Sequence, residues 1–407
     1  MAAIPPTMKA WTVVKNSNPP TASSLRLRTD APSPTSPPTG TNIIVKVAYA
    51  ALNPVDLHLM GVVPAWLPFR KHPIPAMDFS GEVVALGPGT ASSEASEEEK
   101  AIKIGTKVCG ALSVSPIFWG SGTLAEYISV PKDLVARVPE GYPMEAAAGM
   151  MGIAGQTVTL MVREAGGLGE GKTVVINGAS GGTGTVLTQI AKAKGAKVVA
   201  VCSGRNEKMV KGLGADEVVD YTRADKKLED VLAERFGGDG KGKADFVFDC
   251  AGSQELYSHS PRYLREGGKF ITIVGGRSQG IVPWLRNGLR PVAIGGTPRP
   301  FSLLGLTPAG DTAREVAGWV EKGWVREAPI DQVYEMGDAL KVSLVIRNGA
   351  FVSVSVNANG CGGLRRTRSS RASTQRGRLS SRWLLVERMV VCVMQSVLSV
   401  SSRVYDG

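Results

Sequence analysis

The stretch TVVINGASGGTGTVLTQIAKAKGAKVVAVCSGR, residues 173–205, decides the fold of this chain. It opens with a short apolar run, Thr173–Ile176, whose β-branched residues suit a strand buried on both faces of a parallel sheet. A glycine-rich turn follows, then apolar residues at helical spacing up to Gly195, then a second apolar run, Lys197–Val201. The sequence therefore predicts strand, turn, helix and strand, which is the order that a dinucleotide site requires.

The glycine-rich turn is the candidate phosphate cradle. A pyrophosphate can bind the positive end of a helix only where no Cβ keeps it away from the backbone N–H groups. Gly181 would allow that approach, Gly184 would allow close packing of helix on strand, and Ala179 replaces the first glycine of G-x-G-x-x-G. Flexible loops and methyltransferase folds contain similar strings, so the flanking strands and helix are needed for this interpretation. The candidate cofactor residues here are Gly178, Ala179, Ser180, Gly181, Gly182, Thr183 and Gly184.

The second predicted strand is followed by a turn without an acidic residue. Sites for NAD usually place an Asp or Glu about 20 residues past the glycines, where it binds the ribose 2′-OH. Here Ser203, Arg205 and Lys208 offer a hydroxyl and two cations, which suit a 2′-phosphate. The alternative is that the two cations are ordinary solvated surface residues. The sequence favours NADPH as the cofactor.

Length and charge limit the number of domains and the kinds of partner that this chain can have. The chain has 407 residues, enough for two domains with a core each. Its formal charge is +11, but residues 358–407 hold nine Arg against Glu387 and Asp406, or +7, which leaves about +4 for the rest. We therefore expect no nucleic-acid partner and a disordered basic tail, with an RNA- or membrane-binding arm as the alternative. The five cysteines show neither disulfide nor metal-site spacing, which indicates a reducing compartment.

Short apolar runs on both sides of the central stretch predict an α/β fold. Before it, five runs with many turns predict a β-rich domain: Met8–Lys15, Asn42–Ala48, Ile74–Gly87, Lys107–Cys109 and Thr123–Val130. The acidic insert Glu94–Lys100 is expected to be a mobile surface loop. After it, Glu217–Tyr221, Asp245–Asp249 and Lys269–Val274 bring the total to five strands of a doubly wound parallel Rossmann sheet. Ligands bind at the carboxyl edge of such a sheet, although glycines there can also serve only to turn the chain. The further candidate cofactor residues are Cys250, Ala251, Gly252, Val274 and Gly275.

Six motifs occur in a fixed order along the chain: LNPVD (52–56), DFSGEVVALG (78–87), GTLAEY (122–127), Glu145–Gly155, NGASGGTG (177–184) with Gln189 and Lys192, and LGADEVVDY (213–221). With these motifs the chain resembles, over about residues 8–345, the zinc-independent medium-chain dehydrogenase/reductases. This is the group of the zeta-crystallin-like quinone oxidoreductases and the enoyl reductases. The resemblance implies a GroES-like catalytic domain at 1–144, completed by a return segment at 301–357, and a Rossmann NADPH-binding domain at 145–300, with 358–407 as the basic tail.

The same resemblance implies NADPH-dependent reduction of a quinone or an activated C=C bond at the cleft between the domains. By family position, Asn53 would donate its amide near the nicotinamide or the acceptor carbonyl, unless it is only a turn residue before Pro54. Thr157 would lie beside the nicotinamide, and Tyr221 would belong to the cofactor site.

The motifs lack the metal ligands of the zinc relatives. Those relatives carry a Cys near the LNPVD position and Gly-His-Glu where this chain has Met77–Phe79, and no four-cysteine lobe occurs here. The only histidines of the chain are His58, His72 and His259. We therefore expect no metal site. Enoyl thioester reductases of the group often place a Tyr shortly after LNPxD, where this chain reads Gly61–Val63, which favours a quinone or alkenal acceptor.

Other protein classes fit less well. A short-chain dehydrogenase needs Tyr and Lys four residues apart, and no Tyr of this chain has that partner. Two alternative functions stay open: an enoyl thioester reductase, and a non-catalytic protein that holds NADPH as a stabilising ligand. The apolar run Met389–Val400 is too short to span a membrane, and residues 1–15 contain no Arg, so neither a secretory signal nor an Arg-rich transit peptide is evident. The expected location is the cytoplasm, with the mitochondrion as the alternative; the expected partner is a small-molecule acceptor, and a homodimer stays open.

Overall fold

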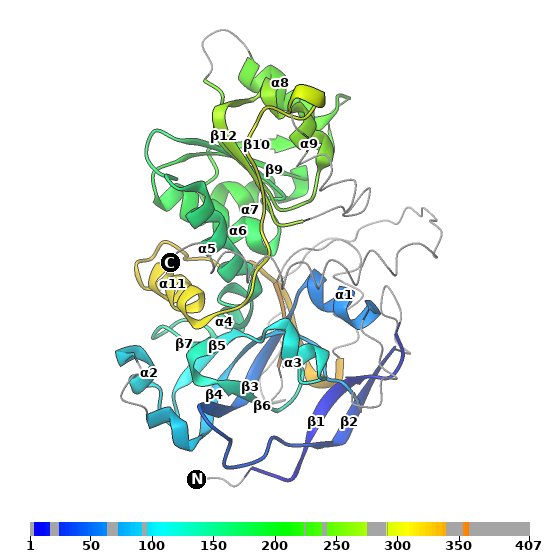
Figure 1. Cartoon of the computed structure of the whole chain (residues 1–407), viewed down its shortest axis with the longest axis vertical. Helices are drawn as coiled ribbons and strands as arrows, with labels where there is room; N and C mark the ends of the chain where they lie inside the picture. Colours follow the sequence, from blue (N-terminus) through cyan, green and yellow to red (C-terminus); the bar gives the residue numbers. More distant parts are fainter. Residues whose placement is uncertain are drawn as a thin grey trace. The chain divides into compact units, whose positions relative to one another are not determined.

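The computed structural model describes residues 4–16, 24–62, 72–91, 96–223, 225–237, 242–274, 290, 292–338 and 353–357. The chain forms two compact units. Of the described residues, those within 4–156, 307–322 and 328–357 form unit 1, and those within 157–306 and 323–327 form unit 2. In Figure 1 the blue and cyan elements belong to unit 1 and most of the green ones to unit 2. The predicted basic tail, 358–407, lies outside the described residues.

Unit 2 contains a six-stranded sheet in the order β10-β9-β8-β11-β12-β13. Every neighbouring pair is parallel, and numbered along the chain the order is the 3-2-1-4-5-6 of a Rossmann fold. The strands are β8 (Thr173–Asn177), β9 (Lys197–Cys202), β10 (Glu217–Asp220), β11 (Ala244–Asp249), β12 (Leu264–Thr272) and β13 (Phe301–Leu303). The predicted Rossmann sheet is confirmed. Its sixth strand, β13, comes from the segment that the sequence assigned to the return into the catalytic domain.

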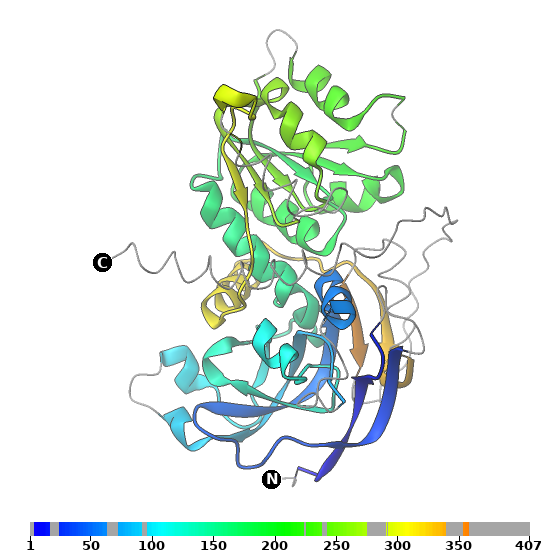
Figure 2. The ribbon, with the colours of Figure 1, turned by 45° about the vertical axis from the view of Figure 1, so that its right-hand side comes forward.

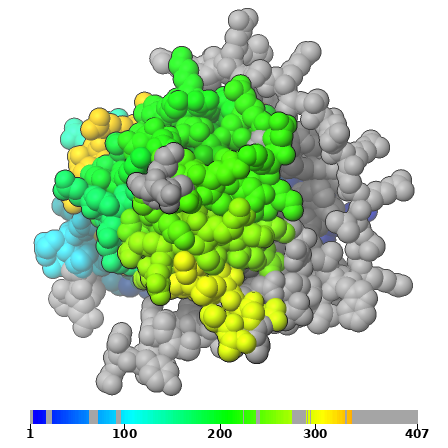
Figure 3. All heavy atoms as spheres, turned by 90° about the horizontal axis from the view of Figure 1, so that it is seen from above, coloured from blue at the N-terminus to red at the C-terminus, as the bar shows by residue number. Residues whose placement is uncertain are grey.

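The core of unit 2 lies between this sheet and its helices. The helices are α5 (Ile153–Ala165), α6 (Gly182–Ala193), α7 (Glu207–Gly212), α8 (Leu228–Gly237) and α9 (Gln254–His259). Strand residues such as Val175 and Val247 and helix residues such as Leu232 and Phe236 are buried in one cluster. Figure 3 shows that the green residues of this unit form one continuous surface. The buried β-branched strands explain why the local sequence pattern was enough to predict this sheet.

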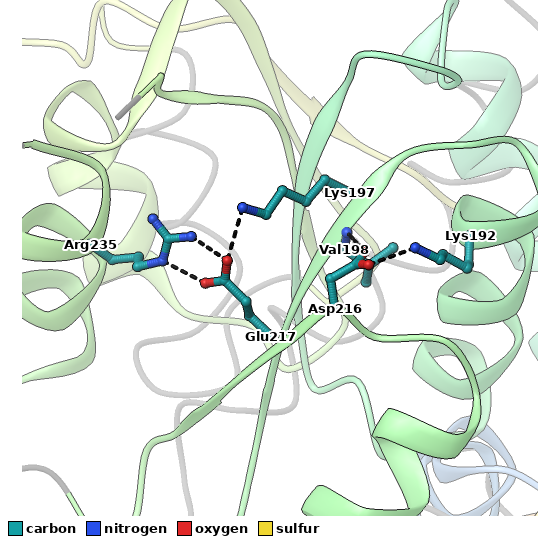
Figure 4. Close-up of polar contacts among 6 residues, drawn as sticks. All are labelled: Lys192, Lys197, Val198, Asp216, Glu217 and Arg235. Atoms are coloured by element: carbon teal, nitrogen blue, oxygen red, sulfur yellow. Dashed lines mark hydrogen bonds and ion pairs between the residues drawn. The ribbon is translucent and has the colours of Figure 1, made fainter. Parts of the chain in front are cut away.

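Ion pairs hold the first residues of the edge strand β10. Asp216 accepts hydrogen bonds from Lys192 Nζ at 2.6 Å and from the N–H of Val198 at 2.8 Å. Glu217 pairs with Arg235 through Nε at 2.6 Å and with Lys197 at 2.9 Å (Figure 4). These cations hold the pKa of Glu217 down at about 2. The strand that carries Asp220 and Tyr221 at its other end is thereby fixed to β9 and α8.

Unit 1 consists of a mainly antiparallel sheet, with one parallel strand pair, and of helices of up to 12 residues. β1 (Thr7–Val13) and β2 (Leu25–Pro32) pair with each other, and a seven-stranded sheet has the order β14-β15-β3-β4-β5-β7, with β6 also paired to β3. Figure 2 shows the late strands β14 and β15 in orange beside the blue β3. The strand bounds are β3 (Asn42–Leu52), β4 (Asp78–Leu86), β5 (Lys107–Ala111), β6 (Tyr127–Pro131), β7 (Val135–Arg137), β14 (Ile330–Glu335) and β15 (Ser353–Asn357). The other helices are α1 (Pro54–Val62), α3 (Val114–Phe118), α4 (Met144–Met150) and α11 (Gly310–Glu321). This β-rich unit agrees with the GroES-like fold that the sequence predicts.

The acidic insert differs from its prediction as a loop. Its described part forms a short helix, α2 (Glu97–Ala101), because Ser96 and Glu99 make a reciprocal capping box. Arg314 of α11 also reaches this helix, 3.5 Å from Glu98 and 3.8 Å from Glu99. The Ser-x-x-Glu spacing was a local signal for this helix, and the predicted loop was wrong there.

Candidate functional site

The glycine turn joins β8 to α6 in unit 2. Gly178 has a left-handed φ of +80°, and the N–H groups of Gly178 and Ala179 each donate to the Val201 carbonyl at 3.1 Å. Gly181 is the N-cap of α6, with no side-chain hydrogen bond to the cap and no acid in the first turn. A Cβ on Gly184 would lie 2.7 Å from the Ala179 Cα, so only glycine allows this close approach. The turn leaves the positive end of α6 free of side-chain caps, as an anion site needs.

Asp249 organises the carboxyl end of β11, at the point where the strand order reverses between β8 and β11. Its carboxylate accepts hydrogen bonds from Asn177 Nδ2 at 2.8 Å and from the N–H groups of Ala251, Gly252 and Ser253 at 3.1, 2.9 and 2.9 Å. Burial raises the pKa of this carboxyl, and the hydrogen bonds oppose the rise. The bonds fix the loop after β11 beside the end of β8, where doubly wound folds bind ligands.

Candidate cofactor residues from three loops meet at this edge. A Cβ on Gly178 would lie 3.5 Å from the Ala251 Cβ, and a Cβ on Gly252 would lie 2.7 Å from Val274 Cγ1. Cys250 follows β11 directly, and burial raises the pKa of its thiol. Gly275 lies outside the described residues.

The candidate 2′-phosphate residues lie after β9. Ser203 is half-buried and accepts a hydrogen bond from Asn206 Nδ2 at 3.3 Å. Arg205 and Lys208 are exposed, and neither pairs with an acidic residue in the part of the chain that the structure describes. Tyr221, after β10, is 56% exposed, and Thr157 is buried in α5. Exposed cations without a protein partner suit an anionic ligand.

Asn53, in unit 1, is held between two buried acids. Its Nδ2 donates to Asp78 Oδ2 at 2.7 Å, and its backbone N–H donates to Asp56 Oδ2 at 2.7 Å. The side-chain amide that the family resemblance assigns to the acceptor therefore already has a partner within the protein, Asp78.

The two acids lie deep in the core of unit 1. Asp78 is 0% exposed, Asp56 is 1% exposed, and the N–H of Ile153 donates to Asp78 Oδ1 at 2.9 Å. Burial raises the pKa of Asp56 to about 7, and burial together with the nearby Asp56 raises the pKa of Asp78 well above its usual value. Asp56 Oδ1 has no hydrogen-bond partner among the described residues. Asp56 also lines a cavity of about 10 Å³, which is about the room that one water molecule needs. The other lining residues are Val13, Leu59, Met60, Ile74, Pro75, Ala76 and Ile117.

The described residues contain no group of three or more His, Cys, Asp or Glu side chains arranged to hold a metal ion. His58, His72 and His259 are all exposed. The two places where zinc relatives carry ligands, the LNPVD loop and residues 77–79, are joined here by the hydrogen bond from Asn53 to Asp78.

Three acids of these sites were missed by sequence reasoning. Asp249 and Asp220 each end a strand, and Asp78 begins one. Asp78 and Asp249 accept hydrogen bonds from residues far away along the chain, as Asn177 and Asp249 are 72 residues apart. The donor to Asp220, Thr222, is only two residues away. The position of an acid at a strand end was the available signal. It does not say which loop the carboxylate meets.

Two family profiles match the chain. The alcohol dehydrogenase GroES-like domain matches residues 39–140, and the zinc-binding dehydrogenase domain matches residues 182–297. The chain therefore belongs to the medium-chain dehydrogenase/reductase superfamily, and it is an NAD(P)-dependent oxidoreductase.

Relatives and solved structures agree with this membership. Medium chain reductase pydE of an Acremonium species is 33% identical over 82% of this chain and 94% of its own length. A trans-enoyl reductase of Aspergillus terreus, pgmF, is 30% identical over 83% of this chain and 91% of its own length. The quinone oxidoreductase of Coxiella burnetii shares the fold with a TM-score of 0.67, at 22% identity, over 86% of this chain and 99% of that one. Among the described residues, no helix is long and apolar enough to cross a membrane.

Proposed function

We propose that this chain transfers a hydride from NADPH to a quinone or an α,β-unsaturated carbonyl compound without a metal ion. The observation that carries the cofactor choice is that Arg205 and Lys208, beside the half-buried Ser203, are exposed and have no acidic partner among the described residues. An acid would stand there in an NAD site. The turn 178–184 would hold the pyrophosphate on α6, and the loops after β11 and β12 would flank the nicotinamide half. NADPH supplies the hydride; the chain binds and orients it.

The acceptor class follows from what the motifs lack. An alcohol gives up hydride readily only as its proton is removed, which needs a metal ion or a general base such as a Tyr and Lys pair. The sequence has neither the Cys and His ligands of the zinc relatives nor Tyr and Lys four residues apart. A quinone or enone accepts hydride directly, because the negative charge spreads onto an oxygen that a hydrogen-bond donor can stabilise.

Three measurements test the proposal. Calorimetry should give NADPH an affinity at least about tenfold above that of NADH, and Arg205→Ala should remove most of the difference. Stopped-flow oxidation of NADPH should proceed with quinones or 2-alkenals and not with simple alcohols, and activity should survive exhaustive chelation. Equal cofactor affinities would contradict the NADPH assignment. Turnover of alcohols alone, or a stoichiometric zinc required for activity, would contradict the reaction.

Reduction of an enoyl thioester is the second candidate. Its support is that relatives of similar length, including pgmF, are named trans-enoyl reductases. An enoyl thioester offered beside quinones and alkenals separates the two candidates by their kcat/KM values. A protein that binds NADPH tightly and oxidises it with none of these acceptors would instead be a binding protein.

A further inference from the structure

The carboxylate of Asp220 ties two turns of unit 2 together. The Asp220 side chain is 13% exposed, and its Oδ1 accepts hydrogen bonds from the N–H of Thr222 at 2.9 Å and from Thr222 Oγ1 at 2.7 Å. Its Oδ2 lies 3.3 Å from Arg223 Nε. Oδ2 also lies against Gly204 and accepts no hydrogen bond from the described residues. The two hydrogen bonds from Thr222 lower the pKa of this carboxyl, so it stays ionised at neutral pH. One side chain at the end of β10 thus holds the turn after β9 and the turn after β10.

Gly204 is the point of contact between the two turns. A Cβ on Gly204 would lie 3.1 Å from the Asp220 Cγ and 3.6 Å from Arg223 Nε. The φ of Gly204 is outside the left-handed region, so it is the neighbouring carboxylate, and not the backbone, that requires glycine here. A larger residue would push the two turns apart without changing any charge.

An acid at this place in an NAD site usually accepts hydrogen bonds from the hydroxyls of the adenosine ribose. The contacts of Asp220 argue against that role. Oδ1 already accepts two hydrogen bonds, and Oδ2 is buried against Gly204 without a hydrogen-bond partner among the described residues, so neither oxygen is open at the surface to a ribose hydroxyl. Each of the two turns carries an exposed cation: Arg205 follows Gly204 directly in the chain, and Arg223, 81% exposed, pairs with the carboxylate. A half-buried acid that contacts both turns, with an exposed cation on each, indicates an organiser of an anion site.

We propose that Asp220 is a positioning residue for cofactor selection, which holds turn 203–205 against turn 221–223 so that Arg205 and Arg223 surround one ribose 2′-phosphate. This inference rests on the proposed use of NADPH and adds Arg223 to the cations that select it. A carboxylate that acted only by its charge would repel the phosphate. A carboxylate that positions both turns must strengthen phosphate binding, so removal of its charge gives opposite results in the two cases.

Calorimetry on the full chain with NADPH, NADH and 2′,5′-ADP tests the proposal. Asn at position 220 keeps one oxygen that can accept from Thr222, but it loses the negative charge that pairs with Arg223. We expect Asp220→Asn and Gly204→Ala each to weaken NADPH and 2′,5′-ADP about tenfold and to change NADH less than about twofold. Asp230→Asn is the matched control, since Asp230 pairs with Arg262 at 2.6 Å on the same unit. It should leave all three affinities unchanged.

The alternatives give different patterns. Tighter NADPH binding by Asp220→Asn would show that the acid only repels the phosphate, and a larger loss for NADH than for NADPH would make Asp220 a ribose ligand. Either result overturns the proposal. Gly204→Ala keeps the charge and carries the test if Asp220→Asn does not fold, which melting temperatures report. A wild-type protein without preference for NADPH refutes the proposed cofactor itself, whereas a preference that both variants retain refutes only the role of Asp220.

Discussion

Replacement of Asp56 by Asn should flatten the pH dependence of the stability of unit 1. Asp56 is 1% exposed, and the other residues that line its small cavity are apolar. An asparagine keeps an oxygen for the N–H of Asn53, which now donates to Asp56 Oδ2 at 2.7 Å, and it never ionises. The variant therefore removes the cost of a buried charge and retains the acceptor.

The magnitude follows from the raised pKa. Burial moves the pKa of Asp56 from 3.8 to about 7, so the folded state holds a proton that the unfolded state releases between these values. The free energy of unfolding then falls as pH rises through this window. The loss is about 1.4 kcal/mol per pH unit, or about 4 kcal/mol in total. Below pH 4 the stabilisation is fully present, and above pH 7 it is gone. The raised pKa of Asp78 acts in the same direction.

Urea unfolding at pH 5, 6, 7 and 8 measures the free energy of unfolding at each pH. A hydrogen-exchange pulse at one fixed pH labels the unfolded protein, and mass spectrometry then reads the label in peptides from β3 and β4. These peptides report on unit 1 alone. Wild type should lose about 3 kcal/mol between pH 5 and pH 8, and Asp56→Asn should lose much less and be the more stable protein at pH 8. Asp133→Asn removes an exposed carboxyl of the same unit and should behave as wild type. Equal slopes for wild type and Asp56→Asn would refute the reasoning.

Gly184→Ala places a methyl group 2.7 Å from the Ala179 Cα, so we expect overpacking of about 1–3 kcal/mol and weaker NADPH binding by calorimetry; unchanged affinity would mean that the turn has room. Asn53→Ala should lower kcat and spare NADPH affinity, and because Asp78 loses its donor at 2.7 Å it should also lower the melting temperature. A loss of NADPH affinity with kcat intact would count against that role. Deletion of residues 358–407 should leave the melting temperature and NADPH binding as they are, since an Arg- and Ser-rich segment buries little apolar surface. A large fall in melting temperature would show that the tail packs on the body.

The sequence by itself determined the elements whose signals are local. Strands β8 and β9, the glycine turn and α6 follow from periodicity and turn chemistry within residues 173–205. The absence of an acid directly after β9 is equally local, and it supports the choice of cofactor. The Ser96 and Glu99 capping box was also local and could have been read.

Only the tertiary structure decided which distant groups meet. It added β13 to the Rossmann sheet, because strand pairing depends on the path of the chain and not on composition. It brought Asp220 to Gly204, and it enclosed Asn53 between Asp56 and Asp78. From the sequence alone, an Asp or Glu is expected at the surface. Whether it is buried, how far its pKa shifts and which groups it contacts can depend on residues tens of positions away. The physical reason is that turns and helices form from neighbours along the chain, while electrostatics and packing depend on neighbours in space.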